Sequence, residues 1–257
     1  MRTASVIATQ SGGLYSNLFV QPNDELRYAM YIHELDGAYA QTDAILSSCG
    51  MGPTEDEVAF QRVVTSHGEI EYGWKKVFPF SYKQTCDSFW MLSYLVHQQE
   101  EREEFYDVEN PENTAAIKLR FTKMLPGVGR ESLVHRFVHR RFREKDRAVY
   151  VWKSSILGDG SFRGMQMDET GWRVIRPSET GDGTFVKVCI RQTPLHLGSS
   201  NAAIALVARQ FDDFVQAMVQ VNCEEMNIAT ESLLLEDALK GVKVRDVYNR
   251  KSPDDYC

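Results

Sequence analysis

The 257-residue sequence has no paired-cysteine pattern, no long hydrophobic run and no excess of basic charge. Its five cysteines are scattered and include no C-x-x-C pair, so neither a disulfide framework nor a zinc site is indicated. No segment approaches the roughly 20 apolar residues of a membrane span, and residues 1–19 lack the apolar core of a secretory signal. We therefore expect an intracellular protein, cytoplasmic or nuclear, without an integral membrane segment.

Catalytic and cofactor motifs are missing as well. There is no G-x-S-x-G or H-E-x-x-H motif, and the glycines of GDGSFRG (158–164) lie between predicted strands, as turn glycines do. His135 and His139 share one face of a predicted strand, but no Glu or Cys accompanies them at metal-ligand spacing. The net charge of −7 disfavours a general nucleic-acid-binding surface. We expect no enzymatic activity, no metal and no cofactor.

The most regular pattern is a helical one in residues 199–221. Its apolar residues recur at i, i+3, i+4 and i+7, and polar residues occupy the opposite face. Many strand-like segments precede it, and short strands joined by turns favour an antiparallel sheet. The predicted fold class is therefore α+β, with a curved antiparallel β-sheet packed on a long C-terminal α-helix. The predicted strands are 69–80, 115–121, 133–142, 147–154, 164–168, 171–176 and 184–193.

Helices are also predicted in residues 23–50 and 82–98, whereas the acidic segment 98–113 is predicted to be a solvated loop. The C-terminal helical pattern continues to residue 240. One helix from 199 to 240 would be about 60 Å long, so we expect a break near 227–230. The expected organisation is a flexible N-terminal segment (1–22), a helix-grip domain (23–222), a C-terminal helical extension (223–241) and a polar tail (242–257).

Several segments resemble a known family, the oomycete mating-specific proteins. The segments are LDGAYAQTDAIL (35–46), VFPF (77–80) followed by Trp90, DRAVYVWKSSI (146–156), GMQMDETGWRVIRP (164–177) and LLLED (233–237). The matching region of that family is START-like, meaning similar to the lipid-transfer domain related to steroidogenic acute regulatory protein. The resemblance implies that this α+β fold is a START-like helix-grip, in which the curved sheet and the long C-terminal helix enclose a hydrophobic tunnel.

Many members of this family are similar to transcription regulators and carry a basic leucine zipper ahead of the START-like region. Residues 1–24 contain no basic run and no leucine heptads. Direct binding of nucleic acid by this chain is therefore not expected, and a regulatory role would need a protein partner.

The expected function is non-enzymatic binding of a hydrophobic or amphipathic, lipid-like ligand in a tunnel of about 300 Å³ or more. A buried cation is rare without a partner, so an inward Arg136, Arg140 or Arg191 would mark an ion pair or the ligand's acidic head. The methionine and aromatic residues of this set can equally form a solid core. The expected ligand-binding residues are Tyr150, Trp152, Met165, Met167, Trp172, Val188, Ile190, Phe211, Phe214, Met218, Arg136 and Arg191.

Two alternatives remain open at this point. In the first, the pocket is collapsed and residues 223–240 form a docking helix for a protein partner, using Leu233, Leu234, Leu235 and Leu239. In the second, the fold carries a cyclase-like enzyme, which needs a polar cluster in the cavity with a shifted pKa. The candidates for that cluster are His135, His139, Asp168 and Glu169.

Overall fold

The computed structural model describes residues 22–95, 101–105, 108–125, 129–181, 183–195 and 202–249. Its helices are α1 (Pro22–Ala40), α2 (Thr42–Ser48), α3 (Tyr82–Leu95), the short 3₁₀ turn η1 (Gly160–Phe162) and α4 (Ala202–Asn249). Its strands are β1 (Val58–Val64), β2 (Ile70–Phe78), β3 (Arg102–Phe105), β4 (Thr114–Leu125), β5 (Gly129–Arg143), β6 (Ala148–Gly158), β7 (Gln166–Pro177) and β8 (Thr184–Pro194). Among the described helices, none combines the length and apolarity needed to cross a membrane.

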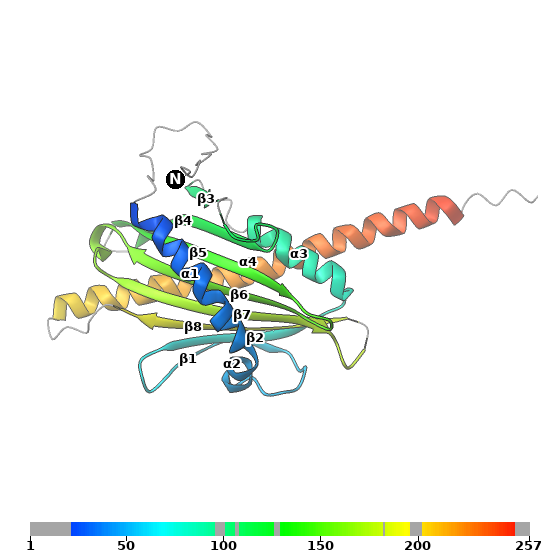
Figure 1. Cartoon of the computed structure of the whole chain (residues 1–257), viewed down its shortest axis with the longest axis horizontal. Coiled ribbons are helices and arrows are strands. Elements are labelled where there is room, and N and C mark those ends of the chain that lie inside the picture. Colours follow the sequence, from blue (N-terminus) through cyan, green and yellow to red (C-terminus); the bar gives the residue numbers. More distant parts are fainter. Residues whose placement is uncertain are drawn as a thin grey trace, which may run out of the picture.

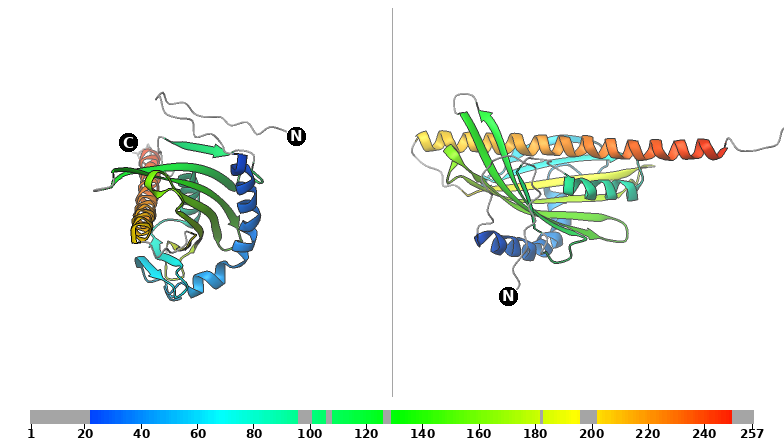
Figure 2. Two further views of the ribbon diagram at one scale, coloured as in Figure 1. Left: turned by 90° about the vertical axis from the view of Figure 1, so that its left-hand side faces the viewer. Right: turned by 90° about the horizontal axis from the view of Figure 1, so that it is seen from above.

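Within these residues, eight strands form one antiparallel sheet in the order β1-β2-β8-β7-β6-β5-β4-β3. The sheet curves around α4, which lies along its concave face together with α3 (Figures 1 and 2). Helices α1 and α2 cover the opposite, convex face (Figure 2). The predicted fold class, a curved antiparallel sheet packed on a long C-terminal helix, is confirmed.

Because helices cover both faces of the sheet, alternate residues of one strand enter two different cores. On β6, Tyr150 and Trp152 join the core on the α4 side. Val149 and Val151, which point the other way, join the core beneath α1. A strand buried on both faces does not show a clean alternation of apolar and polar residues. This explains why the face of each side chain is hard to assign from the sequence.

An ionic cluster attaches α1 to the convex face. Asp24, near the start of α1, accepts hydrogen bonds from Arg136 Nε on β5 at 2.6 Å and from Lys118 Nζ on β4 at 3.1 Å. Burial acts to raise the pKa of Asp24, but the hydrogen bonds and charges of Arg136 and Lys118 outweigh it, and the pKa is lowered. The carboxylate is therefore held ionised, and it fixes the register of α1 on the sheet.

Two expectations about element boundaries are wrong. The segments 164–168 and 171–176 form one strand, β7, because Glu169 and Thr170 continue the pairing with β6. Helix α4 runs without a break through residues 227–230, where Thr230 Oγ1 donates to the carbonyl of Met226 at 2.7 Å. A helix of 48 residues spans about 72 Å, and its C-terminal end extends past the sheet (Figure 1).

The two edge strands of the sheet, β1 and β3, were not predicted from the sequence. Strand β3 lies inside the acidic segment that was expected to be a loop, and it pairs with β4. Its charged residues, Glu103 and Glu104 among them, are typical of an edge strand, which must discourage pairing with other chains. Residues 1–21 and 250–257 lie outside the described residues, so the expected N-terminal segment remains a prediction. The expected tail begins inside α4, which ends at Asn249.

Candidate functional site

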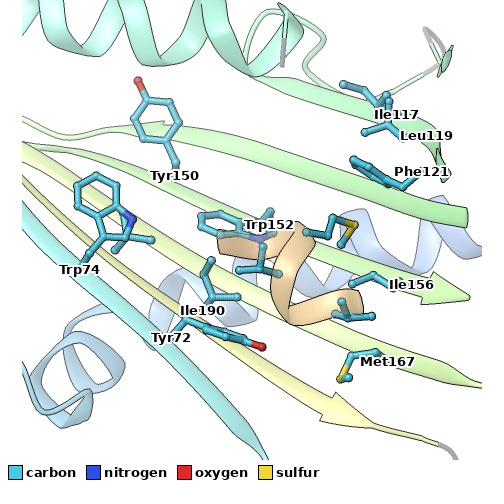
Figure 3. Packing of buried hydrophobic residues seen from close by; sticks show 14 of the residues in the cluster. Tyr72, Trp74, Ile117, Leu119, Phe121, Tyr150, Trp152, Ile156, Met167 and Ile190 are labelled. Carbon is cyan, nitrogen blue, oxygen red and sulfur yellow. The ribbon is translucent and has the colours of Figure 1, made fainter. Parts of the chain in front are cut away.

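The candidate site is a cavity between the concave face of the sheet and α4, with a volume of about 120 Å³. Its apolar walls include Trp74, Tyr150, Trp152 and Ile190, which project from neighbouring strands into the same interior (Figure 3). Helix α4 contributes one face through residues spaced three and four apart, as a helix requires. These α4 residues are Met218, Val219, Asn222, Cys223 and Met226.

This volume is smaller than the tunnel of about 300 Å³ that was expected. Large aromatic side chains such as Trp74, Tyr150 and Trp152 occupy much of the interior (Figure 3). An apolar cavity of about 150 Å³ accepts benzene, and the present space is somewhat smaller, so it limits an enclosed apolar body to one ring at most. A whole acyl chain or sterol does not fit this arrangement, and the expectation of a lipid-sized tunnel is corrected accordingly.

Several of the expected ligand-binding residues meet at this cavity. Tyr150, Trp152, Val188, Ile190 and Met218 line it. The others on the concave side belong to the surrounding core instead, and Phe162 lies against Phe211 and Phe214 with ring centroids 5.9 and 6.2 Å away. The core residues that do not line the cavity are Met165, Met167, Phe211 and Phe214.

Trp172 was expected in the cavity wall but lies on the convex face. Its Nε1–H donates to the carbonyl of Ala38 at the end of α1, at 2.8 Å. On a continuous strand, residues an odd number apart face opposite sides, so Trp172 cannot share a face with Met167. The error followed directly from dividing β7 into two segments.

The expectation that Arg136 or Arg191 faces inward is also wrong. Arg136 is held by Asp24 beneath α1. Arg191 lies on the convex side of β8 and donates to Glu71 at 2.7 Å. Arg140, likewise considered, is paired with Asp36 at 3.2 Å. All three arginines therefore have ion-pair partners outside the cavity.

The arginine that does line the cavity is Arg173 on β7. Its guanidinium carbon lies 4.6 Å from the ring centroid of Phe89 and 5.9 Å from those of Tyr150 and Trp152. Its Nε is buried without a hydrogen-bond partner, and burial lowers the pKa of the guanidinium. Sequence reasoning missed Arg173, although counting by twos from Met167 along an unbroken strand would have found it.

Glu169 lies four residues before Arg173 on the same face of β7. Trp152 Nε1 donates to one carboxyl oxygen at 2.8 Å, and Gln192 Nε2 donates to the other at 2.7 Å. Burial raises the pKa of Glu169, and these hydrogen bonds only partly oppose the effect. Glu169 thus has a stronger tendency to be neutral than an exposed glutamate.

Gly171 separates Glu169 from Arg173, and the indole of Trp152 covers it. A Cβ atom at position 171 would lie 2.0 Å from Cε2 and Cζ2 of Trp152, so only glycine allows the ring to lie across the strand. At about 3.3 Å per residue, the backbone positions of Glu169 and Arg173 are about 13 Å apart. The buried acid and the buried cation therefore do not pair.

Three of the four residues considered for catalysis line the cavity, namely His135, His139 and Glu169. Asp168 lies on the convex face instead. Burial, together with the charges of three arginines that include Arg173, lowers the pKa of His139 to about 3. His139 is therefore neutral at pH 7. Among the described residues, no group of three His, Cys, Asp or Glu side chains is arranged to hold a metal ion.

A second, larger groove of about 600 Å³ lies on the convex face between α1 and the sheet. Its walls are partly polar and partly apolar, and its lysine and arginine already have partners. Lys153 is paired with Glu34 at 2.7 Å, and Arg191 is paired with Glu71 at 2.7 Å. Since these cations are already neutralised, we favour the smaller, apolar cavity as the site.

No family model and no curated protein matches the chain. Solved structures with a similar arrangement include human STARD10, at 8% identity and a TM-score of 0.44, over 83% of this chain and 88% of that one. Ara h 8.0201 is 13% identical over 66% of this chain and 99% of its own, with a TM-score of 0.37. CalU16 from Micromonospora echinospora is 13% identical over 73% and 98%, with a TM-score of 0.25. Likenesses at this level support no statement about ligand or activity, and the fold assignment rests on the sheet and helix described above.

Proposed function

We propose that this protein is a non-enzymatic binding module that holds one compact hydrophobic or amphipathic ligand between the concave face of its sheet and α4. The observation that carries the proposal is a mainly apolar cavity that contains a cation with aromatic neighbours and no counter-ion, Arg173. The START-like resemblance of residues 146–177 to the oomycete family favours the same function. The smaller cavity replaces the lipid-like ligand of the sequence prediction with a ligand about one ring in size.

The energetics of such a ligand are modest. Six buried carbons contribute about 5 kcal/mol at ~0.8 kcal/mol each, before the cost of ordering the ligand. Since a dissociation constant of about 1 mM corresponds to about 4 kcal/mol, the apolar body alone binds weakly. A useful affinity therefore requires at least one polar contact in addition to the apolar walls.

Native mass spectrometry of the full chain, followed by organic extraction, tests the proposal. We expect the purified protein to retain a compact organic molecule, or to be stabilised against heat by ring-sized compounds. The matched variants are Asn222→Trp, which fills the cavity from α4, and Gln220→Trp, which adds the same ring two residues away on the exposed face. Loss of binding in both variants or in neither, or no binding by the native chain, contradicts the proposal.

Protein interaction through α4 is the second candidate function. Ile228, Leu235 and Leu239 on α4 are well exposed. The C-terminal end of α4 extends past the sheet (Figure 1). Leu234, also expected at the docking surface, is fully buried in the protein's own core. Sedimentation of the full chain and of Leu235→Lys tests this alternative, which requires self-association or partner binding that the substitution abolishes.

A proton-transfer enzyme is favoured by one observation, the position of His135, His139 and Glu169 in the cavity wall. Against it, both oxygens of Glu169 already accept hydrogen bonds, and His139 is too weak a base at pH 7. Recovery of the extracted ligand chemically unchanged after incubation with the protein would exclude this alternative. A product that forms with the native chain and not with Glu169→Gln would establish it.

A further inference from the structure

Arg173 differs from the buried arginines Arg136, Arg140 and Arg141 in having neither an ion pair nor a hydrogen bond among the described residues. Arg136 donates to Asp24 at 2.6 Å, Arg140 is paired with Asp36 at 3.2 Å, and Arg141 donates to the side chain of Asn113 at 3.1 Å. Within the described part of the chain, Arg173 makes no ion pair and no hydrogen bond. Burying a guanidinium without an anion is unfavourable, and such groups are normally paired. The position therefore indicates that a partner for Arg173 comes from outside the chain.

The aromatic neighbours of Arg173 contact the flat face of its guanidinium group but accept no hydrogen bonds from the N–H donors at its edge. The ring of Phe89, 4.6 Å away, gives a cation–π contact. The N–H donors of a guanidinium point outward in its own plane, where they need oxygen acceptors. The hydroxyl of Tyr150 is engaged, because it donates to the carbonyl of Cys86 on α3 at 2.9 Å. The donor edge of Arg173 is thus left for a ligand.

The positive electrostatic potential around Arg173 favours the binding of an anion. The charges of Arg173, Arg141 and Arg102 all help, after burial, to lower the pKa of His139. Arg141 donates to the neutral side chain of Asn113 and so keeps its charge uncompensated there. The carboxyl of Glu169, which belongs to the same cavity, is engaged by Trp152 and Gln192.

We propose that the ligand is a compact carboxylic acid, with its carboxylate bound by Arg173 and its single ring or branched apolar body against Trp152, Ile190 and Met218. This inference rests on the proposed binding function and names its ligand class. Two carboxylate oxygens match the two parallel N–H donors of one guanidinium. A phosphate dianion would need a second cation at the same point, and the volume of about 120 Å³ is too small for an apolar body larger than a single ring.

The test is calorimetric titration of the full chain with benzoate, cyclohexanecarboxylate and benzamide. Benzamide has nearly the shape of benzoate but carries no charge. We expect both acids to bind and benzamide to bind ~10- to 100-fold more weakly, the range of a charge-assisted hydrogen bond. The same ratio should appear as a larger thermal stabilisation of the native chain by benzoate than by benzamide, a readout that needs no variant.

Two variants assign the effect to Arg173. In Arg173→Met, benzoate should lose its advantage over benzamide while benzamide binding stays unchanged, and Arg173→Lys should keep part of the advantage. Equal binding of benzoate and benzamide by the native chain overturns the carboxylate inference but leaves the proposed function in place. If neither compound nor cyclohexanecarboxylate binds, the inference also fails, and the retained mass in the extraction experiment then decides the proposed function separately.

Discussion

At the scale of single residues, Gly171 and Trp152 determine the shape of the cavity. Substitution Gly171→Ala should destabilise the protein by at least ~2 kcal/mol, because the new methyl group would overlap the indole of Trp152. The free energy of unfolding, measured in urea, checks this. The control is Gly37→Ala in α1, where a Cβ atom would meet nothing within 4 Å. This substitution should stabilise the protein by ~0.5–1 kcal/mol, because alanine favours a helix more than glycine does. If Gly171→Ala is tolerated as well as Gly37→Ala, the position of the Trp152 ring is wrong.

His139 should make stability depend on acidity. Its pKa is about 3 in the folded protein against 6.5 for the ordinary group, so the unfolded chain binds more protons at intermediate pH. The stability contributed by neutral His139 is complete above pH 6.5 and is lost as pH falls, by up to ~1.4 kcal/mol per unit between 6.5 and about 3. Unfolding free energies measured at pH 7 and pH 5 check this for the native chain and for His139→Gln. The variant should lose less stability between these two pH values than the native chain. Equal losses would show that His139 is not buried in its neutral form.

The residues that line the cavity were only partly predictable from the sequence. Tyr150, Trp152, Val188 and Ile190 were placed at the cavity because β6 and β8 were recognised as unbroken strands. Arg173 was missed and Trp172 misplaced for one reason, the supposed interruption of β7 at Glu169 and Thr170. A polar residue inside a strand looks like a break in a sequence, whereas in the structure Glu169 is bonded within the cavity wall.

At the scale of elements, α1 is held on the sheet by a buried carboxylate. Asp24→Asn should cost about 3–5 kcal/mol, because it leaves the buried Arg136 without its counter-ion and removes the nearer of the two carboxylates that pair with Lys118. Asp36→Asn is the matched control, since the Asp36 side chain is 71% exposed and an exposed ion pair contributes at most ~1 kcal/mol. Equal effects of the two substitutions on the free energy of unfolding would argue against the burial of Asp24.

Neighbouring leucines on α4 should behave in opposite ways. Leu234 is fully buried and Leu235 is 55% exposed, so Leu234→Ala should cost ~2–5 kcal/mol and Leu235→Ala less than about 0.5 kcal/mol. Thermal and urea unfolding of the two variants check the difference. The reverse order would mean that α4 is rotated relative to the core.

The elements themselves were largely predictable. Six of the strands and all four α-helices lie in segments predicted from hydrophobic periodicity, although α1 and α2 were predicted as one helical region, and β1 and the charged edge strand β3 were not predicted. The break expected in α4 was wrong because it assumed that a helix cannot be longer than the domain it belongs to. Nothing prevents a helix from extending beyond its sheet, and Thr230 stays helical by bonding to the carbonyl of Met226.

At the scale of the whole molecule, the sheet and α4 form the predicted grip, but the volume between them could not be predicted. That volume depends on the side-chain conformations of Trp74, Tyr150 and Trp152, and a sequence pattern carries no information about them. The cavity of about 120 Å³ therefore changes the expected ligand from lipid-sized to ring-sized without changing the fold.

The most direct test of the central claim is methyl NMR of the methionines during titration with benzoate and benzamide. Met218 and Met226 line the cavity, whereas Met30 and Met91 are exposed elsewhere. A ligand bound between the sheet and α4 should shift the methyl signals of Met218 and Met226 and leave those of Met30 and Met91 in place. Saturating concentrations of both compounds that leave Met218 and Met226 unchanged, or that shift Met30 and Met91 instead, would contradict the account.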